Sequence, residues 1–507
     1  MKQFFVYLSV VIVVIFVVAC SNKDEILESP NALDSGYVYL LTVDATKGDN
    51  SELTRALELS ADSKISASWS TTEDVFVMAP DGWFDGSLKP QSNGSSTKLK
   101  GTISGQTVNV GDKISLLFPR KDWDYTGQIG TLEDIASKYD YSNALNVSVT
   151  EVNDGKILTE SATFGNPQTI IKFTLVDIDG SPIKATKLTI KAVNTSDQPG
   201  LALTRKFGSV LATGDIEITP SGSTNEIYAA LSKNGTAISR LTLIASYGGE
   251  DYIYTKEGFN FTHRRYYDIT VQMPKYPIDL SSVTKHYVGS VIGSDGKVYF
   301  DMESAYAAGT TASAIIAYVG SDTGDENFKK GLAISMRDVK GSPVWKSEAT
   351  VQDNVNMYNT IEAALSAKES GRSMSSEKHT SDYPAINSAY LNDITADAKI
   401  GEKPSSITSD WFLPSIFQWN QIVNGLTGKS ADLSESANDN CKADLFNGRI
   451  VLAGGMELFP SSSPQGRYWS SSECSTTNIW TYNVREGSAE KSVKSSAWPK
   501  TRAVFAF

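Results

Sequence analysis

The chain has 507 residues, of which 40% are hydrophobic, and this length and composition predict about three domains with their own cores. It carries 46 basic and 58 acidic residues, a formal net charge of -12. A surface that follows nucleic-acid phosphates needs clustered Lys and Arg, and the sequence has no such cluster beyond Arg264 and Arg265. The composition therefore argues against nucleic acid as a partner.

The first 20 residues have the pattern of a cleaved export signal. The cation Lys2 precedes an uncharged run from Phe4 to Cys20, which ends Val-Val-Ala-Cys and is too short to span a membrane with ease. This pattern resembles the bacterial lipoprotein signal. The resemblance implies that residues 1–19 are removed and that Cys20 carries a diacylglycerol and an acyl chain, which together anchor the protein stably. We expect no cofactor beyond this covalent lipid.

Residues 20–35 are predicted to form a lipidated tether. Its start, Ser-Asn-Lys-Asp-Glu at 21–25, resembles the acidic export tag of surface-displayed lipoproteins of the Bacteroidetes. The alternative is a solvated acidic linker without that role. The first interpretation predicts a surface-exposed lipoprotein of the cell outer membrane.

Short runs of β-branched and aromatic residues follow, and turn residues bound nearly all of them. The runs are 36–44, 74–79, 168–177, 187–191 and 266–273, and turn clusters lie at 92–96, 179–180, 221–223 and 234–235. The pattern lacks βαβ alternation and predicts a mainly β fold built from sandwiches.

Helical signals are few. One short helix is predicted from Thr131, which is suited to cap it and is followed by acidic residues in the first turn. Two more helices, over 355–368 and 414–426, carry apolar residues at helical spacing and set the last third of the chain apart.

Short motifs in a fixed order give the first half a family likeness. They are Thr54-Arg55-Ala56, Ala67-Ser68-Trp69, Glu73-Asp74-Val75-Phe76-Val77, Gly130-Thr131-Leu132-Glu133-Asp134, Tyr139-Asp140-Tyr141, Ile170-Ile171-Lys172-Phe173 and Tyr266-Tyr267-Asp268-Ile269. The order resembles that of the Bacteroidales fimbrillins, or type V pilins, over about residues 36–275. The resemblance implies two β-sandwich domains, which we place at 36–165 and 166–275.

The fimbrillin resemblance also implies a mode of assembly. In that family an arginine-specific protease cuts in the first loop and releases the first strand, and Arg55 with Ala56 stands at the matching place. Loss of residues 36–44 would expose unpaired backbone groups and an apolar groove. A strand donated by another pilin subunit would fill this groove by β-augmentation. The alternative is that Arg55 is a solvated loop residue.

Residues 286–507 differ from a bare stalk subunit. Trp411-Phe412-Leu413-Pro414-Ser415, Tyr468-Trp469-Ser470-Ser471 and Arg502-Ala503-Val504 resemble a C-type-lectin-like domain of bacterial surface proteins, which implies an α+β fold. We expect residues 503–507 to close this domain by pairing near its start, so that they are not free to be donated. This topology predicts a tip or accessory fimbrial subunit.

Ligand and metal signals in the last third are weak. The Glu-Pro-Asn and Gln-Pro-Asp triplets of calcium-dependent lectins are absent from the sequence, so no metal is predicted. Trp469, Trp480, Tyr482 and Trp498 could stack on a sugar ring, or they could form core, as aromatic residues at strand spacing usually do.

Cysteine and histidine usage offers no catalytic site. Cys441 and Cys474 could form one disulfide or remain two buried thiols. The three histidines lie in no metal-binding or nucleophile-activating motif, so no enzyme is expected.

The sequence thus predicts a surface-exposed fimbrial subunit with two kinds of partner. Other pilin subunits would bind by strand insertion, and a host or bacterial surface glycan or protein would bind the last domain. The alternative is an outer-membrane lipoprotein outside any pilus that binds polysaccharide.

Overall fold

A computed structural model describes residues 37–47, 58–59, 65–66, 68–119, 121–206, 209–259, 261–263, 265–348, 352–353, 356–429, 433, 439–456, 458 and 466–507. The predicted signal peptide, the tether, Cys20, Arg55 and Ala56 lie outside these residues. The described chain is mainly β, as predicted, and its strands lie in several separate sheets. No helix among the described residues is long and apolar enough to cross a membrane.

A ten-stranded sheet surrounds the first hydrophobic core, in the order β5-β4-β9-β11-β12-β1-β8-β6 with β13 beside β1 and β7 beside β8. The strands are β1 Val38–Lys47, β4 Phe76–Ala79, β5 Gly82–Trp83, β6 Asp85–Gly86, β7 Lys89–Pro90, β8 Ser96–Ser104, β9 Lys113–Phe118, β11 Ser142–Asn153, β12 Lys156–Thr159 and β13 Ala162–Phe164, and a separate short hairpin joins β2 Glu58–Leu59 to β3 Ile65–Ser66. The register of β11 shifts twice, once against β9 and once against β12. Such bulges bend a strand, which lets one sheet curve around a core.

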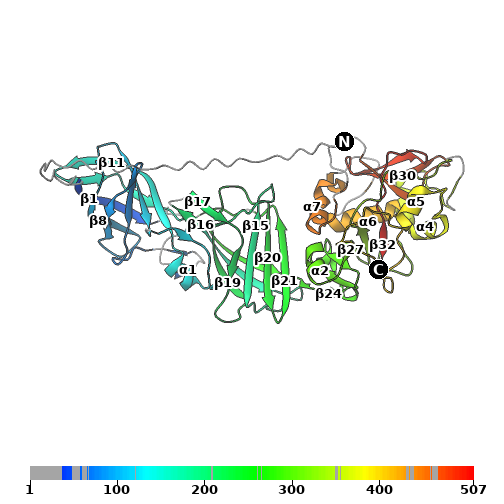
Figure 1. Cartoon of the computed structure of the whole chain (residues 1–507), viewed down its shortest axis with the longest axis horizontal. Coiled ribbons are helices and arrows are strands. Elements are labelled where there is room, and N and C mark those ends of the chain that lie inside the picture. The colour runs from blue at the N-terminus through cyan, green and yellow to red at the C-terminus, as the bar shows by residue number, and fades with distance from the viewer. Residues whose placement is uncertain are drawn as a thin grey trace, which may run out of the picture.

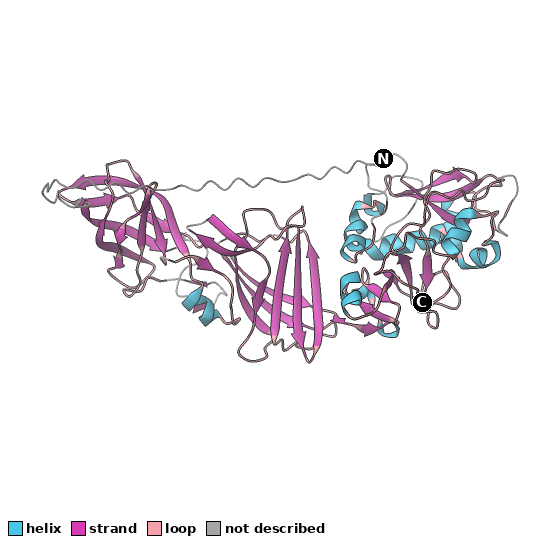
Figure 2. Ribbon diagram, in the orientation of Figure 1, coloured by secondary structure: helices cyan, strands magenta, loops and turns pink. Residues whose placement is uncertain are grey.

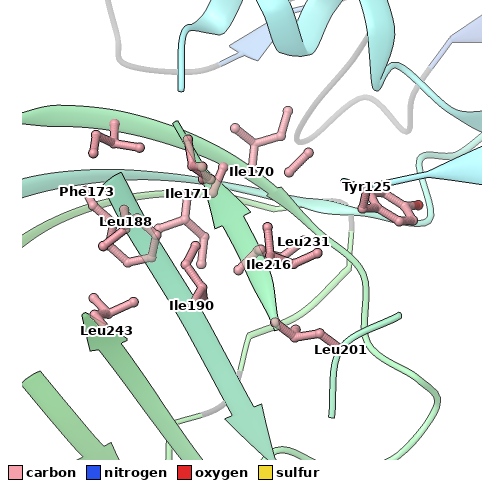
Figure 3. Close-up of a cluster of buried hydrophobic side chains, with 14 of the residues drawn as sticks. Tyr125, Ile170, Ile171, Phe173, Leu188, Ile190, Leu201, Ile216, Leu231 and Leu243 are labelled. Atoms are coloured by element: carbon pink, nitrogen blue, oxygen red, sulfur yellow. The ribbon is translucent and has the colours of Figure 1, made fainter. Parts of the chain in front are cut away.

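Two facing sheets form the second sandwich. One has the order β19-β14-β22 and the other β18-β15-β20-β21-β23. The strands are β14 Thr169–Val176, β15 Lys187–Val193, β18 Ile216–Ile218, β19 Glu226–Leu231, β20 Arg240–Tyr247, β21 Glu250–Glu257, β22 Tyr266–Gln272 and β23 Lys275–Tyr276. Figure 3 shows Ile171 and Phe173 of β14 beside Leu188 and Ile190 of β15, so side chains from both sheets make this core.

One segment of the chain connects the first two cores. After β9 the chain forms β10, Trp123–Asp124, which pairs with β16, Ala202–Lys206, and β16 pairs in turn with β17, Ser209–Thr213. Helix α1, Leu132–Lys138, follows as predicted. Trp123, Tyr125 and Ile135 are buried in the second core, and β11 then returns to the first sandwich. Residues 123–141 thus precede the predicted boundary at 165 yet pack with the second sandwich, and the domain limits remain a prediction.

The last part of the chain is α+β. Its six-stranded sheet has the order β24-β26-β25-β27-β28-β32, and β29, β30 and β31 form a smaller one. The strands are β24 Ile278–Asp279, β25 Val291–Gly293, β26 Lys297–Tyr299, β27 Ala312–Val319, β28 Gly331–Ser335, β29 Arg467–Glu473, β30 Asn478–Asn483, β31 Ser488–Val493 and β32 Val504–Ala506. The helices are α2 Met302–Ala307, α3 Ile361–Ala367, α4 Arg372–Lys378, α5 Pro384–Tyr390, α6 Ile416–Thr427 and α7 Asp444–Leu452, with 3-10 turns η1 Leu280–Ser282, η2 Lys285–Tyr287 and η3 Asp439–Cys441.

The two helices predicted in this part exist with different starts. Helix α6 begins at Ile416, two residues later than expected, because Ser415 caps it in a capping box with Gln418. Helix α3 starts at Ile361, six residues later than expected, because Thr360 caps it and its side chain accepts a hydrogen bond from the Ala363 N–H.

The last strand pairs farther into its domain than the sequence predicted. β32 pairs with β28, at residues 331–335, and not with β25, the first strand of the domain predicted at 286–507. The other edge of β32 is covered by the chain before α6, where Phe412 and Val504 exchange backbone hydrogen bonds of 2.8 and 3.0 Å. Val504 and Phe505 are fully buried, so the strand has partners on both edges.

The three parts lie in a row along the long axis of the molecule (Figure 1), and the helices gather in the last part (Figure 2). The second and last parts meet at a packed junction. β23 pairs with β21 of the second sandwich, and two residues later β24 pairs with β26 of the last sheet. Ile253 and Tyr276 share one core with the last part, so this junction is not a free linker.

Candidate functional site: the first strand and its groove

Strand β1 has partners on both of its edges. It runs antiparallel to β8, from the pair Val38 and Ser104 to the pair Thr46 and Ser96. On the other edge it runs parallel to β12 and then to β13. Removal of β1 would therefore leave two rows of unpaired backbone N–H and C=O groups.

The side chains of β1 alternate strictly between core and surface. Tyr39, Leu41, Val43 and Ala45 are buried in the first core, while Asp44 on the other face has a side chain that is 63% exposed. Burial of each large aliphatic side chain contributes roughly 1.5–3 kcal/mol. The strand thus fills a long apolar groove between β8 and the β12–β13 edge.

Lys47 continues the buried face of β1 and is only 4% exposed. Its Nζ lies 2.7 Å from Glu73 Oε2 and donates a hydrogen bond of 3.0 Å to the Ser68 carbonyl. The same Nζ lies 3.8 Å from the centroid of the Trp69 ring. A buried ammonium is tolerated only with such partners, so these contacts compensate for its loss of water.

The predicted first strand ended at Asp44, and Lys47 was not singled out. A lysine is seldom buried, which hides it from a composition-based prediction. The usable signal was its spacing, because Lys47 stands two residues after Ala45 and continues the period of two.

Three of the four aromatic residues predicted as sugar contacts are core residues. Trp469, Trp480 and Tyr482 are at most 1% exposed. The indole N–H groups of the two tryptophans donate to the carbonyls of Pro343 and Tyr358, both at 2.9 Å. A ring that is enclosed on both faces cannot stack on a sugar, so the prediction was wrong for these three.

Trp498 is the exception among the four aromatic residues, since it is 60% exposed. It follows β31 in a turn, where its backbone N–H donates to the Ser496 hydroxyl at 3.3 Å. It remains a ligand contact by prediction.

Cys441 and Cys474 are buried thiols, which was one of the two alternatives. Burial raises the pKa of the Cys474 thiol to about 11, so it is protonated at neutral pH. The Tyr482 hydroxyl donates to the Cys441 carbonyl. A protonated buried thiol is a poor nucleophile.

A buried ion cluster lies between the small sheet of the last part and the residues before α3. Lys494 and Glu473 are fully buried and in contact, and Lys494 Nζ lies 2.7 Å from Asp353 Oδ2. Lys346 and the Tyr383 hydroxyl bind the other oxygen of Asp353. Burial by itself would raise the pKa of the Asp353 carboxyl, but the hydrogen bonds from the two lysines and Tyr383 outweigh it and lower the pKa. Two cations balance two carboxylates, which suits a structural cluster.

A groove of about 440 Å³ lies between β20 of the second sandwich and α2 of the last part. Arg240, Lys191 and Glu303 line it together with apolar side chains such as Ile253 and Phe300. Within the described ranges no group of three or more His, Cys, Asp or Glu side chains is placed to hold a metal ion.

No family model and no curated protein matches the chain. Solved structures do match it. A fimbrial protein from Bacteroides ovatus matches at 12% identity with a TM-score of 0.29, over 94% of this chain and 100% of its own. A candidate cell adhesion protein from Bacteroides uniformis matches at 13% identity and 0.29, over 46% and 97%. A streptococcal ancillary pilin matches at 9% identity and 0.18, over 47% and 70%.

Proposed function

We propose that this chain is a cell-surface fimbrial subunit that accepts a strand from another pilin subunit and mediates adhesion through its last domain. The observation that carries the proposal is the position of β1 between β8 on one edge and β12 and β13 on the other. Arg55 lies in the chain between β1 and the next strand of this sheet, β4. A cut there would leave β1 attached to its sandwich by non-covalent contacts alone.

The sandwich without β1 would bind a replacement strand readily. The groove would expose its apolar lining and two unpaired strand edges, which are costly in water and template another strand. A donated strand restores the backbone hydrogen bonds and the alternating side-chain contacts together.

A tip or accessory position in the filament is the finer part of the proposal. β32 is built into its own sheet between β28 and the Phe412 segment, so this strand cannot be donated without opening the domain. The acceptor groove and the last domain lie at opposite ends of the row (Figure 1). An adhesive domain would then project away from the joint with the filament.

The anchor and the ligand class belong to the same proposal. Cys20 would carry the lipid that brings the protein to the outer membrane, and release of residues before Ala56 would detach it. The last domain, at about residues 286–507, would bind a glycan or protein on a host or bacterial surface, with Trp498 as the exposed aromatic contact.

N-terminal mass mapping of protein sheared from the cell surface tests this proposal. We expect an N-terminus at Ala56 in high-mass filaments. An Arg55→Lys variant keeps the positive charge but removes the arginine, so it should show neither the Ala56 N-terminus nor the filaments. Arg240→Lys serves as the matched control, since Arg240 forms a surface pair with Asp197. A lipidated Cys20 on a protein found only as a monomer would contradict the pilus assignment.

That last result would favour a second function, a lipoprotein that binds polysaccharide outside any pilus. The exposed ring of Trp498 is the observation in its favour, since sugars stack on exposed aromatic rings.

A further inference from the structure

The geometry points to a chemical requirement on the incoming strand: we propose that it carries a lysine or arginine at the position of Lys47. This inference rests on the proposed strand replacement and names a property of the partner. Its basis is a cation site at one end of the β1 groove. The alternation of apolar residues along β1 does not account for a lysine at this position.

The cation and its partners come from different segments of the chain. Lys47 is the last residue of β1, whereas Ser68, Trp69 and Glu73 come after Arg55 in the sequence. If β1 leaves, it takes the ammonium with it. The carbonyl of Ser68, the carboxylate of Glu73 and the face of Trp69 stay with the sandwich.

These three groups share one preference, which is for a cation. The carboxylate carries a charge, the carbonyl is an acceptor, and the Trp69 ring presents its electron-rich face at 3.8 Å. Phe164 of β13 packs edge-on against Trp69 with ring centroids 5.0 Å apart, which helps to fix the ring. The site is therefore built by residues that a strand exchange does not remove.

An apolar side chain at this position would be costly. It would deprive the Ser68 carbonyl and the Glu73 carboxylate of this donor in a place where Lys47 is only 4% exposed. The Glu73 side chain is 17% exposed, so the pair is only partly buried on the carboxylate side. Removal of the lysine would still destabilise the sandwich, because the carboxylate that stays behind loses a charged partner in a largely apolar surrounding.

The cation also discriminates between strands. The pattern of Tyr39, Leu41, Val43 and Ala45 is a plain alternation of apolar residues that many strands share. A basic residue at the next core-facing position is much rarer, and a strand with an acidic residue there would place two carboxylates together. Lys47 thus marks the position that selects the partner.

Strand capture during refolding tests the inference. The full chain, with a recognition sequence for a site-specific protease in place of residues 53–57, is cut and unfolded, and the β1 fragment is removed. The remainder refolds with equal amounts of two labelled peptides spanning 37–47, and mass spectrometry gives the ratio captured.

We expect the native peptide to be preferred over a Lys47→Met peptide by about tenfold or more. A Lys47→Arg peptide should bind nearly as well as the native one. An Asp44→Asn peptide is the matched control, because it removes one charge from the same strand at an exposed position. It should compete within about twofold of the native peptide.

The outcomes separate the inference from the function on which it rests. Equal capture of the native and Lys47→Met peptides would overturn the cation requirement and leave strand replacement intact. Capture of no peptide at all would overturn both. A Glu73→Gln chain should show a smaller preference for lysine, and an unchanged preference would exclude Glu73 as the partner.

Discussion

At the scale of single residues, a buried polar side chain can hold two separate segments of the chain together by hydrogen bonds. Gln128 is buried, and its side chain makes three hydrogen bonds. Its amide donates to the carbonyls of Tyr125 at 2.7 Å and Ala230 at 2.9 Å, and its oxygen accepts from the Ala230 N–H at 2.7 Å. It thereby ties the segment before α1 to β19 of the second sandwich.

Replacement of this amide should therefore be costly. We expect Gln128→Ala to lower the free energy of unfolding by about 3 kcal/mol, because buried backbone groups lose their partners. Gln91→Ala is the control, since Gln91 is exposed and its side chain donates a hydrogen bond to the nearby Lys89 carbonyl. Urea unfolding measures both, and equal small losses would show that Gln128 is dispensable.

The buried ion cluster predicts a pH dependence. The pKa of Asp353 is lowered in the folded state, so its contribution to stability is complete above the unfolded value of about 3.9 and is lost as the pH falls through the folded value. We expect the acid-induced loss of stability of the last part to be reduced in Asp353→Asn, which should also be less stable at neutral pH. Urea midpoints from pH 7 down into the acid range, followed by Trp fluorescence, measure this. An Asp353→Asn protein with the native midpoint at pH 7 would contradict it.

At the scale of elements, α1 shows how a turn positions a helix on a sheet. Gly130 precedes the capping residue Thr131, has a φ of +77° and accepts a 2.9 Å hydrogen bond from the Tyr228 N–H. A Cβ at this position would meet the Cγ2 atoms of Ile218 and Ile227, both at 3.1 Å. The close approach of α1 to β18 and β19 thus requires glycine.

A pair of glycine substitutions separates the two reasons for this requirement. Gly130→Ala should cost about 2–3 kcal/mol, since it adds steric overlap to the strain of a positive φ. Gly180 has a φ of +87° and nothing within 4 Å of its Cβ position, so Gly180→Ala should cost only about 1 kcal/mol. Thermal unfolding of both variants checks the difference, and equal shifts would mean that the isoleucines move aside freely.

At the scale of the whole molecule, the proposed site for another pilin subunit and the proposed adhesive domain lie far apart. The β1 groove is at one end of the row and the last domain at the other (Figure 1). The second sandwich lies between them and joins both neighbours through shared cores. Force applied at the ends would then pass through packed joints.

Trp498 is the residue with which to test adhesion at this scale. We expect Trp498→Ala to reduce attachment of cells about tenfold, because exposed tryptophans contribute strongly to binding surfaces. Filament incorporation and the melting temperature should not change, since the side chain is 60% exposed. Leu391→Ala, at a similarly exposed apolar residue of the same part, is the control. Normal attachment by the Trp498 variant would remove it from the adhesive surface.

The sequence by itself determined the local structure of this protein. Alternation of apolar residues and turn clusters predicted β1, β4, β14, β15 and β22 within a few residues. A capping signal predicted α1, and apolar residues at helical spacing predicted α6. These features depend on neighbours along the chain, which a period of two or of 3.6 residues records.

Only the tertiary structure decided which side chains are buried and which meet. Lys47 reaches Glu73 on another segment, Gln128 reaches Ala230, and Trp469 is core while Trp498 is exposed. β32 pairs with β28 and not with β25, the first strand of its predicted domain. The physical reason is that burial and pairing depend on contacts between residues distant in sequence, and no local pattern records them.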